Sequence, residues 1–396
     1  MGSRIERFVS DKVCRVERGI FYVIQDEARR LEKLGNEMTY LHLGNPKYSL
    51  PEHVLKATED AMREGYIRYT GDKGFEDLRE AITDNLKKTK GIDVDPVTGV
   101  VITVGGIGAC WAALYGSINP GDEVILTDPC YPTHRLQCNL IGGRIVNVRL
   151  HEGLEFNPDL EEVKEVITPK TKVMLINSPN NPTGGVITTG TLRGLAEISI
   201  DEDLLVISDE AYERILFDGR THLSIASLSG MAERTVVAGS FSKTYAIPGL
   251  RVGYMAGPSE LVSRYIKAHY ATCVNSPSLS QKMVLAAING PQDWVDEMVK
   301  DYERKRNVVH SKLESVNEVT CIKPHSTFYL FPNISKYGMN SFELAQYLVR
   351  EAGVATTPGC GFGPGGEGHI RISNANVSLT ELMSAMDRIE EVLVKL

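Results

Sequence analysis

The sequence of 396 residues lacks the features that mark secreted, membrane and nucleic-acid-binding proteins. None of its apolar runs approaches the roughly 20 residues that span a bilayer, and its charged N-terminal stretch has no apolar core of signal-peptide length. Basic residues are in deficit, with 43 lysines and arginines against 51 aspartates and glutamates. Binding to nucleic acid or to an anionic membrane needs a basic excess. We therefore expect a cytoplasmic protein with small-molecule partners, which binds neither nucleic acid nor membrane.

The cysteines also lack the spacings that are typical of disulfide frameworks and zinc sites. The seven cysteines are an odd number, lie far apart, and include neither a Cys-x-x-Cys pair nor a histidine at zinc-binding spacing. This pattern predicts reduced thiols and no metal site.

What is present is an ordinary globular composition, 42% apolar and 24% charged, with enough length for two domains. Short, almost continuously apolar runs alternate with helical stretches through the middle of the chain. This alternation predicts an α/β fold with a mainly parallel, seven-stranded sheet covered by helices on both faces. The predicted strands are Val100–Val104, Glu123–Thr127, Arg144–Val148, Lys172–Asn177, Leu204–Ser208, Thr235–Gly239 and Arg251–Ala256.

The character of the chain changes after about residue 290, where we expect a smaller α+β domain. Its predicted elements are a helix at Asp293–Leu313, hairpin-like strands near Cys321–Phe331, and helices at Ser341–Ala352 and Leu379–Val394. A helix at Tyr22–Leu34 is expected to pack with this domain. The predicted domains are therefore 46–289 for the large domain and 1–45 with 290–396 for the small one. The glycine-rich stretch Gly359–Gly368 lacks a Walker lysine and is interpreted as a mobile loop.

The clearest candidate for chemistry is Lys243, in the segment Ser240-Phe-Ser-Lys243 that runs directly off an apolar strand. Ligands of α/β proteins bind at such strand ends. A single lysine is usually just a solvated surface residue. However, Ser240, Ser242 and Arg251 add two hydroxyls and a guanidinium, which together suit a phosphate group.

Polar side chains follow other predicted strands as well. Asp209 ends one strand and precedes Tyr212, while Asn181 lies in the Asn-Asn-Pro-Thr-Gly turn after another. An aspartate here can pair with a protonated pyridine nitrogen, and the amide and phenol can bond a ring oxygen. A strand-end cap and a turn former are the structural alternatives for Asp209 and Asn181.

Two further turns have the right chemistry for a flat, phosphorylated ligand. Gly106 and Ile107 lie where a strand passes into a helix, so their N–H groups can bind an anion. Tyr131, after the next strand, offers an aromatic face that can stack on a ring, although an ordinary turn aromatic is equally compatible with this position.

Taken together and in this order, these motifs and the C-terminal His-Ile-Arg371-Ile-Ser resemble the fold-type I pyridoxal-phosphate aminotransferases of class I/II, the aspartate-aminotransferase-like family. The likeness extends from about residue 20 to the end. It implies a transaminase of amino-acid metabolism with pyridoxal 5'-phosphate as cofactor. Such an enzyme moves an amino group from an L-amino acid to a 2-oxo acid by a ping-pong mechanism, and the expected acceptor is 2-oxoglutarate.

The resemblance also implies a role for each matching residue. Lys243 would bind the cofactor covalently and move a proton between the substrate Cα and the cofactor. Asp209 would pair with the pyridine nitrogen, and Arg371, helped by Asn181 and the backbone of Gly44, would bind the substrate α-carboxylate. The remaining cofactor contacts would be Asn181 and Tyr212 at the ring oxygen, Tyr131 on the ring face, and Ser240, Ser242, Arg251, Gly106 and Ile107 at the phosphate. Tyr69 would reach the phosphate of a neighbouring subunit, which implies a homodimer with shared active sites.

The donor stays open between aspartate, alanine, aromatic and broad neutral amino acids. Family members that prefer aspartate commonly have a lysine where this chain has Ile107, and the Gly19–Tyr22 stretch that borders the side-chain pocket in similar enzymes is apolar apart from one phenol. Arg15 or Arg18 remains a candidate for the missing charge. A β-lyase or decarboxylase of the same fold is the nearest alternative activity, and a cofactor-binding regulatory module is a more distant one.

Overall fold

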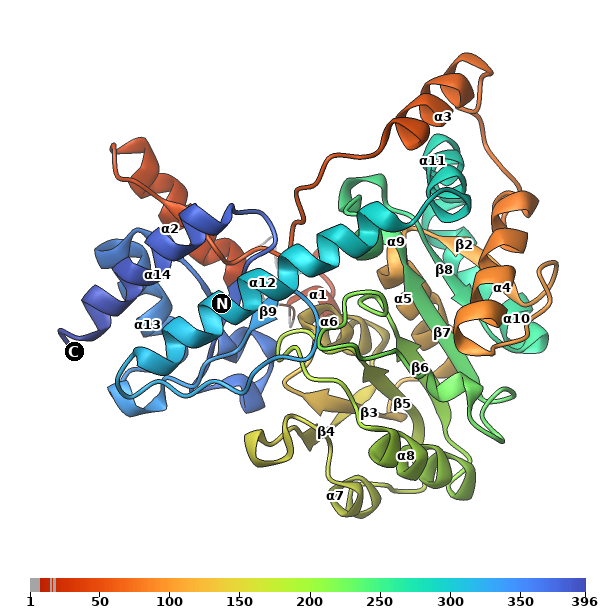
Figure 1. The fold of residues 1–396 in the computed structure, drawn as a ribbon. Coiled ribbons are helices and arrows are strands. Elements are labelled where there is room, and N and C mark those ends of the chain that lie inside the picture. The colour runs from red at the N-terminus through yellow and green to blue at the C-terminus, as the bar shows by residue number, and fades with distance from the viewer. Residues whose placement is uncertain (1–7, 15, 17–18) are drawn as a thin grey trace.

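The computed structural model describes residues 8–14, 16 and 19–396 (Figure 1). Its largest element is a seven-stranded sheet, which confirms the predicted α/β class. The strands are β2 (Val100–Thr103), β3 (Glu123–Asp128), β4 (Arg144–Arg149), β5 (Thr171–Asn177), β6 (Leu205–Asp209), β7 (Thr235–Ser240) and β8 (Gly253–Ala256). Each of them overlaps a strand predicted from the sequence.

The strand order is β2-β8-β7-β6-β5-β3-β4, and only β8 runs antiparallel to its neighbours. The carboxyl ends of the other strands therefore gather at one edge of the sheet. The strand β8 begins at Gly253, two residues later than predicted. The reason is that Arg251 has a φ of 54°, a left-handed conformation that cannot belong to a strand.

Helices cover both faces because alternate strand residues point to opposite sides of the sheet. On one face Val101 and Val173 belong to a core shared with α5, α6 and α10. On the other face, Ile102 packs with α4, α11 and α12 (Asp293–Ser315), and Met174 packs with α8. The helices of this part are α3 (Glu52–Arg63), α4 (Glu76–Lys90), α5 (Gly105–Ser117), α6 (Pro132–Ile141), α7 (Leu160–Glu165), α8 (Thr189–Asp201), α9 (Phe241–Thr244), α10 (Ser259–Cys273) and α11 (Ser278–Asn289).

A second group of elements surrounds a separate apolar core that includes Leu41, Leu344 and Ile389. Figure 1 shows the long helix α12 (Asp293–Ser315) running from the sheet into this group. The other members are α2 (Ile20–Lys33), α13 (Ser341–Tyr347), a π-helical turn at Leu348–Ala352, α14 (Leu379–Leu393), and the strands β1 (Thr39–Tyr40), β9 (Tyr329–Leu330), β10 (Val354–Ala355), β11 (Thr357–Pro358) and β12 (Ile370–Ser373). As expected, α2 packs here, with Ile24 and Ala28 against Ala345 and Val349. The short helix α1 (Asp11–Cys14) instead contacts α6 of the sheet-bearing part.

Two local predictions differ from the structure in this group. The hairpin expected near 321–331 is reduced to an isolated antiparallel bridge between Thr320 and Asn333, and the strand within the segment, β9, pairs instead with β12, some forty residues later. The stretch Gly359–Gly368 is not a free loop. It forms two 3-10 turns, and the N–H of Gly365 donates to the carboxylate of Asp128 at 2.9 Å. Its glycines allow this close approach: a Cβ on Gly365 would lie 2.6 Å from the backbone oxygen of Asp128.

Composition gave two further expectations, reduced cysteines and the absence of a membrane-spanning helix. Among the helices in the described residues, none is long and apolar enough to cross a membrane. All seven cysteines are free thiols, as expected.

Candidate active site

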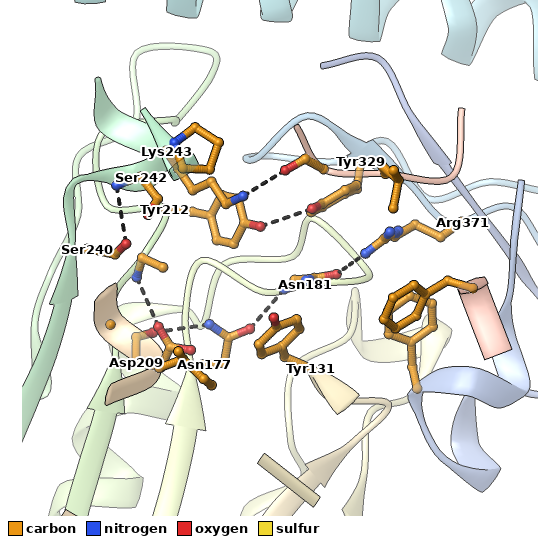
Figure 2. Close-up of a pocket in the computed structure, with 18 of the residues that line it drawn as sticks. Tyr131, Asn177, Asn181, Asp209, Tyr212, Ser240, Ser242, Lys243, Tyr329 and Arg371 are labelled. Atoms are coloured by element: carbon orange, nitrogen blue, oxygen red, sulfur yellow. Dashed lines mark hydrogen bonds between the residues drawn. The ribbon is translucent and has the colours of Figure 1, made fainter. Parts of the chain in front are cut away.

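The carboxyl edge of the sheet opens into a cavity of about 220 Å³ between the sheet and the β9–β12 group (Figure 2). The structure brings together there every site residue predicted from the sequence except Tyr69. The lining comprises Phe21, Leu43, Gly44, Gly106, Ile107, Tyr131, Asn177, Asn181, Asp209, Ala211, Tyr212, Ser240, Ser242, Lys243, Pro248, Arg251, Tyr329, Phe362 and Arg371.

Lys243 lies on α9, the short helix that follows β7. The last residue of β7, Ser240, is the N-cap of α9, and its hydroxyl accepts from the N–H of Ser242. Its Nζ donates to the carbonyl oxygen of Gly44 at 2.7 Å. Burial, together with the positive charges of Arg371 and Arg251, lowers the pKa of the Lys243 ammonium from 10.5 to about 8. The amine therefore loses its proton far more readily than a surface lysine does, as a nucleophile requires.

Asp209 ends β6 with its carboxylate held from two sides. One oxygen accepts from the N–H of Ala211 at 3.1 Å, and the other lies 3.0 Å from Nε2 of His134. His134 is completely buried on α6, one turn after Tyr131. His134 is not predicted from the sequence, where its only signal is that spacing from Tyr131. The arrangement fixes an acidic group at the floor of the cavity.

Two asparagines connect Asp209 with Arg371 across the cavity. Asn177 donates to the backbone oxygen of Asp209 at 3.2 Å, and its Oδ1 accepts from the N–H of Asn181 at 2.9 Å. Asn181 in turn accepts from Nη1 of Arg371 at 2.8 Å. Figure 2 shows this chain of bonds with Tyr131 beside it. Asn181 is thus fixed at a point where the substrate and cofactor sides of the cavity meet.

Arg371 projects from β12 and is buried. Its Nη2 donates to the backbone oxygen of His42 at 2.6 Å, and its guanidinium lies 4.2 Å from the ring centre of Tyr329 and 4.8 Å from that of Phe362. Its hydrogen bonds within the described residues go to the uncharged oxygens of Asn181, His42 and Thr357, whereas a buried guanidinium is normally paired with an anion. The geometry suits a carboxylate that arrives with a ligand.

A second set of donors meets at the start of α5. The N-cap residue, Val104, provides no side-chain cap, so the first N–H groups of this 13-residue helix are available to an anion. Gly105 has a φ of +69°, and a Cβ there would lie 2.8 Å from Nη2 of Arg251. A Cβ on Gly106 would likewise lie 3.1 Å from the Cβ of Ser240. The missing side chains thus allow the helix start, the serine and the guanidinium to converge on one anion.

Tyr329 and Phe362 also line the cavity, and neither is predicted as a site residue from the sequence. Tyr329 lies in an apolar run that reads as a core strand, and Phe362 lies among glycines. Tyr69, by contrast, does not line the cavity of its own chain, and 85% of its surface is exposed.

Comparison with known proteins identifies the class. A family model described as aminotransferase class I and II matches residues 36–389. The chain therefore belongs to this family. It is an enzyme that transfers amino groups between amino acids and oxo acids with pyridoxal phosphate as cofactor, and the relatives do not favour a lyase or decarboxylase.

The relatives differ in their named substrates. The chain is 37% identical to aromatic-amino-acid aminotransferase 2 of Thermococcus litoralis and 37% identical to an aspartate aminotransferase of Pyrococcus abyssi, in each case over 89% of this chain and 91% of the relative. An alanine aminotransferase structure from Pyrococcus furiosus superposes with a TM-score of 0.92 at 29% identity, covering 98% of this chain and all of the other. The family alone therefore leaves the donor undecided.

The residues present fit the cofactor on structural grounds. A pyridine ring needs an acid at its nitrogen, a phosphate needs an anion site, and a covalent bond to the protein needs a lysine that can lose its proton. Asp209, the start of α5 and Lys243 supply these three groups around one cavity.

Proposed function

We propose that the residues of this cavity bind the cofactor and the substrate and carry out the proton transfer. Lys243 binds the cofactor covalently and carries the proton that leaves the substrate Cα. Asp209 pairs with the pyridine nitrogen, which lets the bound cofactor act as an electron sink. Arg371 binds the substrate α-carboxylate through two parallel hydrogen bonds (a bidentate contact), with Asn181 and Gly44 beside it. The other contacts are Asn181 and Tyr212 at the ring oxygen, Tyr131 on the ring, and Ser240, Ser242, Arg251, Gly106 and Ile107 at the phosphate.

We further propose that the enzyme accepts neutral and aromatic amino acids and is not restricted to acidic ones. The observation that carries this proposal is the apolar lining formed by Phe21, Leu43, Ile107 and Phe362. Within the described lining, the cations are Lys243, Arg251 and Arg371, and each has a role at the cofactor or at the α-carboxylate. A second carboxylate would lose its water here without gaining a positive partner from the described lining, so an acidic substrate needs a cation from outside it.

We propose 2-oxoglutarate as the acceptor in a ping-pong cycle. Its distal carboxylate needs a cation, and the candidates in this chain are Arg15 and Arg18, which lie outside the described residues. Their place before α2, which carries Phe21 into the lining, supports this assignment.

A panel of amino donors with 2-oxoglutarate tests the proposal. We expect kcat/KM values for alanine or phenylalanine at least comparable to that for aspartate. A value for aspartate far above both would contradict it. The matched variant Ile107→Lys adds a cation to the apolar lining, so it should raise kcat/KM for aspartate relative to phenylalanine by about tenfold or more, the effect of one new charged hydrogen bond.

We propose that the enzyme is a homodimer with shared sites, in which Tyr69 of each subunit reaches the phosphate of the other. The exposure of Tyr69 and its absence from its own cavity support this assembly. We also propose a cytoplasmic role in amino-acid biosynthesis. Seven free cysteines support this compartment, since oxidising compartments favour disulfides.

A further inference from the structure

Tyr329 lines the cavity between its two chemical ends. Its backbone lies in β9 opposite Ser373 of β12, two residues from Arg371. The side chain is buried, and its hydroxyl lies 3.0 Å from the hydroxyl of Tyr212 (Figure 2). A residue of the small β9–β12 sheet thus reaches the residue proposed to bind the cofactor ring oxygen.

The packing around Tyr329 leaves room for its hydroxyl only because residue 44 is a glycine. A Cβ on Gly44 would lie 1.8 Å from the Tyr329 hydroxyl oxygen and 2.8 Å from its Cζ. The same Gly44 accepts the hydrogen bond from Lys243. On its other side, the ring of Tyr329 stacks on the Arg371 guanidinium at 4.2 Å. Tyr329 therefore contacts Tyr212, Gly44 and Arg371 at once.

The role proposed for Tyr212 determines which of the two hydroxyls donates, since at 3.0 Å either of them can. Each phenol has one proton to donate and lone pairs to accept with. Burial raises the pKa of both Tyr212 and Tyr329, so both keep their protons near neutral pH. If Tyr212 donates its proton to the cofactor, its oxygen is left to accept, and Tyr329 is the neighbour that donates to it. Such consecutive bonds strengthen one another in a buried site.

We propose that Tyr329 is a positioning residue for the aminotransferase reaction. Its hydroxyl strengthens the hydrogen bond of Tyr212 to the cofactor ring oxygen, and its ring holds Arg371 in place for the substrate carboxylate. This inference rests on the role of Tyr212 proposed above.

A pH titration of the visible absorption of the holoenzyme tests the hydroxyl. Without Tyr329, the Tyr212 hydroxyl would be a weaker donor and the cofactor ring oxygen would be more basic. The proton of the Lys243–cofactor group, which that oxygen and the Lys243 nitrogen share, would then be lost only at a higher pH. We expect Tyr329→Phe to raise the pKa of this group by about half to one unit, the equivalent of one ordinary hydrogen bond, and Tyr212→Phe to raise it further. In a Tyr212→Phe background, Tyr329→Phe should add nothing.

The outcomes separate the two proposals. If Tyr212→Phe causes a shift and Tyr329→Phe does not, or if the two shifts simply add, the inference about Tyr329 is wrong. If Tyr212→Phe causes no shift, the proposed role of Tyr212 itself fails. Tyr302→Phe is the matched control: Tyr302 is a fully buried tyrosine whose hydroxyl has no hydrogen-bond partner in the described structure, and its removal should leave the pKa unchanged.

A second variant tests the ring. Tyr329→Phe keeps the aromatic face under Arg371, whereas Tyr329→Leu removes it. We expect KM for the best donor of the panel to stay within about twofold of wild type in Tyr329→Phe and to rise about fivefold or more in Tyr329→Leu, in line with a buried cation–π contact. Equal KM values in the two variants would overturn the proposed role of the ring.

Discussion

At the scale of single residues, the chemistry depends on how a buried amine is kept reactive. Lys243 has a carbonyl oxygen as its hydrogen-bond acceptor, from Gly44, and its strongest charged neighbours are the cations Arg371 and Arg251. Both its burial and its neighbours disfavour the ammonium form. The same two arginines that would hold the substrate carboxylate and the cofactor phosphate thus prepare the lysine before either anion arrives.

The first prediction follows from this environment. In the apoenzyme, Lys243 should titrate near pH 8 and not near its ordinary 10.5. Replacing Arg371 with leucine removes a repelling charge, so it should raise this pKa. The measurement is NMR of lysines labelled by reductive methylation with ¹³C, with the Lys243→Ala variant assigning the signal. A Lys243 signal that titrates with the surface lysines would contradict the account.

The sequence predicted most of the site at this scale, for an identifiable reason. Asp209, Asn177 and Ser240 end neighbouring strands, so strand assignment alone brings them to one edge of the sheet. His134 and Tyr329 could not be found in this way. His134 is positioned by the orientation of a helix, and Tyr329 by the pairing of β9 with a strand that is distant in sequence.

At the scale of elements, the loop after β4 is hydrogen-bonded to residues next to β12, the strand that carries Arg371. Glu152, in the 3-10 turn Glu152–Leu154, accepts from the ring nitrogen of His369 at 2.7 Å and from the amide of Asn333 at 2.5 Å. The bonds from His369 and Asn333 lower the pKa of Glu152 below 4.5, against the opposing effect of its burial. The contact joins the sheet-bearing part of the chain to β12, two residues from Arg371.

The second prediction concerns stability against pH. Because the pKa of Glu152 is lower in the folded state than in the unfolded one, its contribution is complete above pH 4.5 and is lost as the pH falls below that value. Glu152→Gln should cost about 1 kcal/mol near pH 7, allowing for partial exposure, and progressively less below about pH 4.5. Urea unfolding midpoints at a series of pH values measure the difference.

The control for this prediction lies in the same loop. Glu155 has a longer contact, 3.3 Å to His325, and 62% of its side chain is exposed. Glu155→Gln should therefore change the midpoint much less than Glu152→Gln. A pH-independent difference between Glu152→Gln and wild type would show that the lowered pKa is not the source of the effect.

The elements themselves were predictable to different degrees. Strands buried on both faces, such as β5 and β6, are continuous apolar runs that have few alternative interpretations. The two-residue strands β9, β10 and β11 carry no such signal, because their positions come from distant partners. The limits of the two domains remain a prediction.

At the scale of the whole molecule, the third prediction tests whether sites are shared between subunits. Tyr69→Ala and Lys243→Ala should each abolish or strongly reduce activity. In a mixed dimer with shared sites, one site combines an intact Lys243 with an intact Tyr69 from the other subunit. Mixing the two variants in equal amounts under subunit exchange should restore about a quarter of wild-type activity. If mixing restores nothing, Tyr69 does not act across the interface.

The most direct test of the account is to locate the covalent bond to the cofactor. Borohydride reduction of the holoenzyme followed by peptide mapping should place a pyridoxyl group on Lys243, and Lys243→Ala should lose the visible absorption of the covalently bound cofactor while keeping the fold. A pyridoxyl group on another lysine, or an unchanged spectrum and activity in Lys243→Ala, would contradict the central claim that Lys243 carries the chemistry of this aminotransferase.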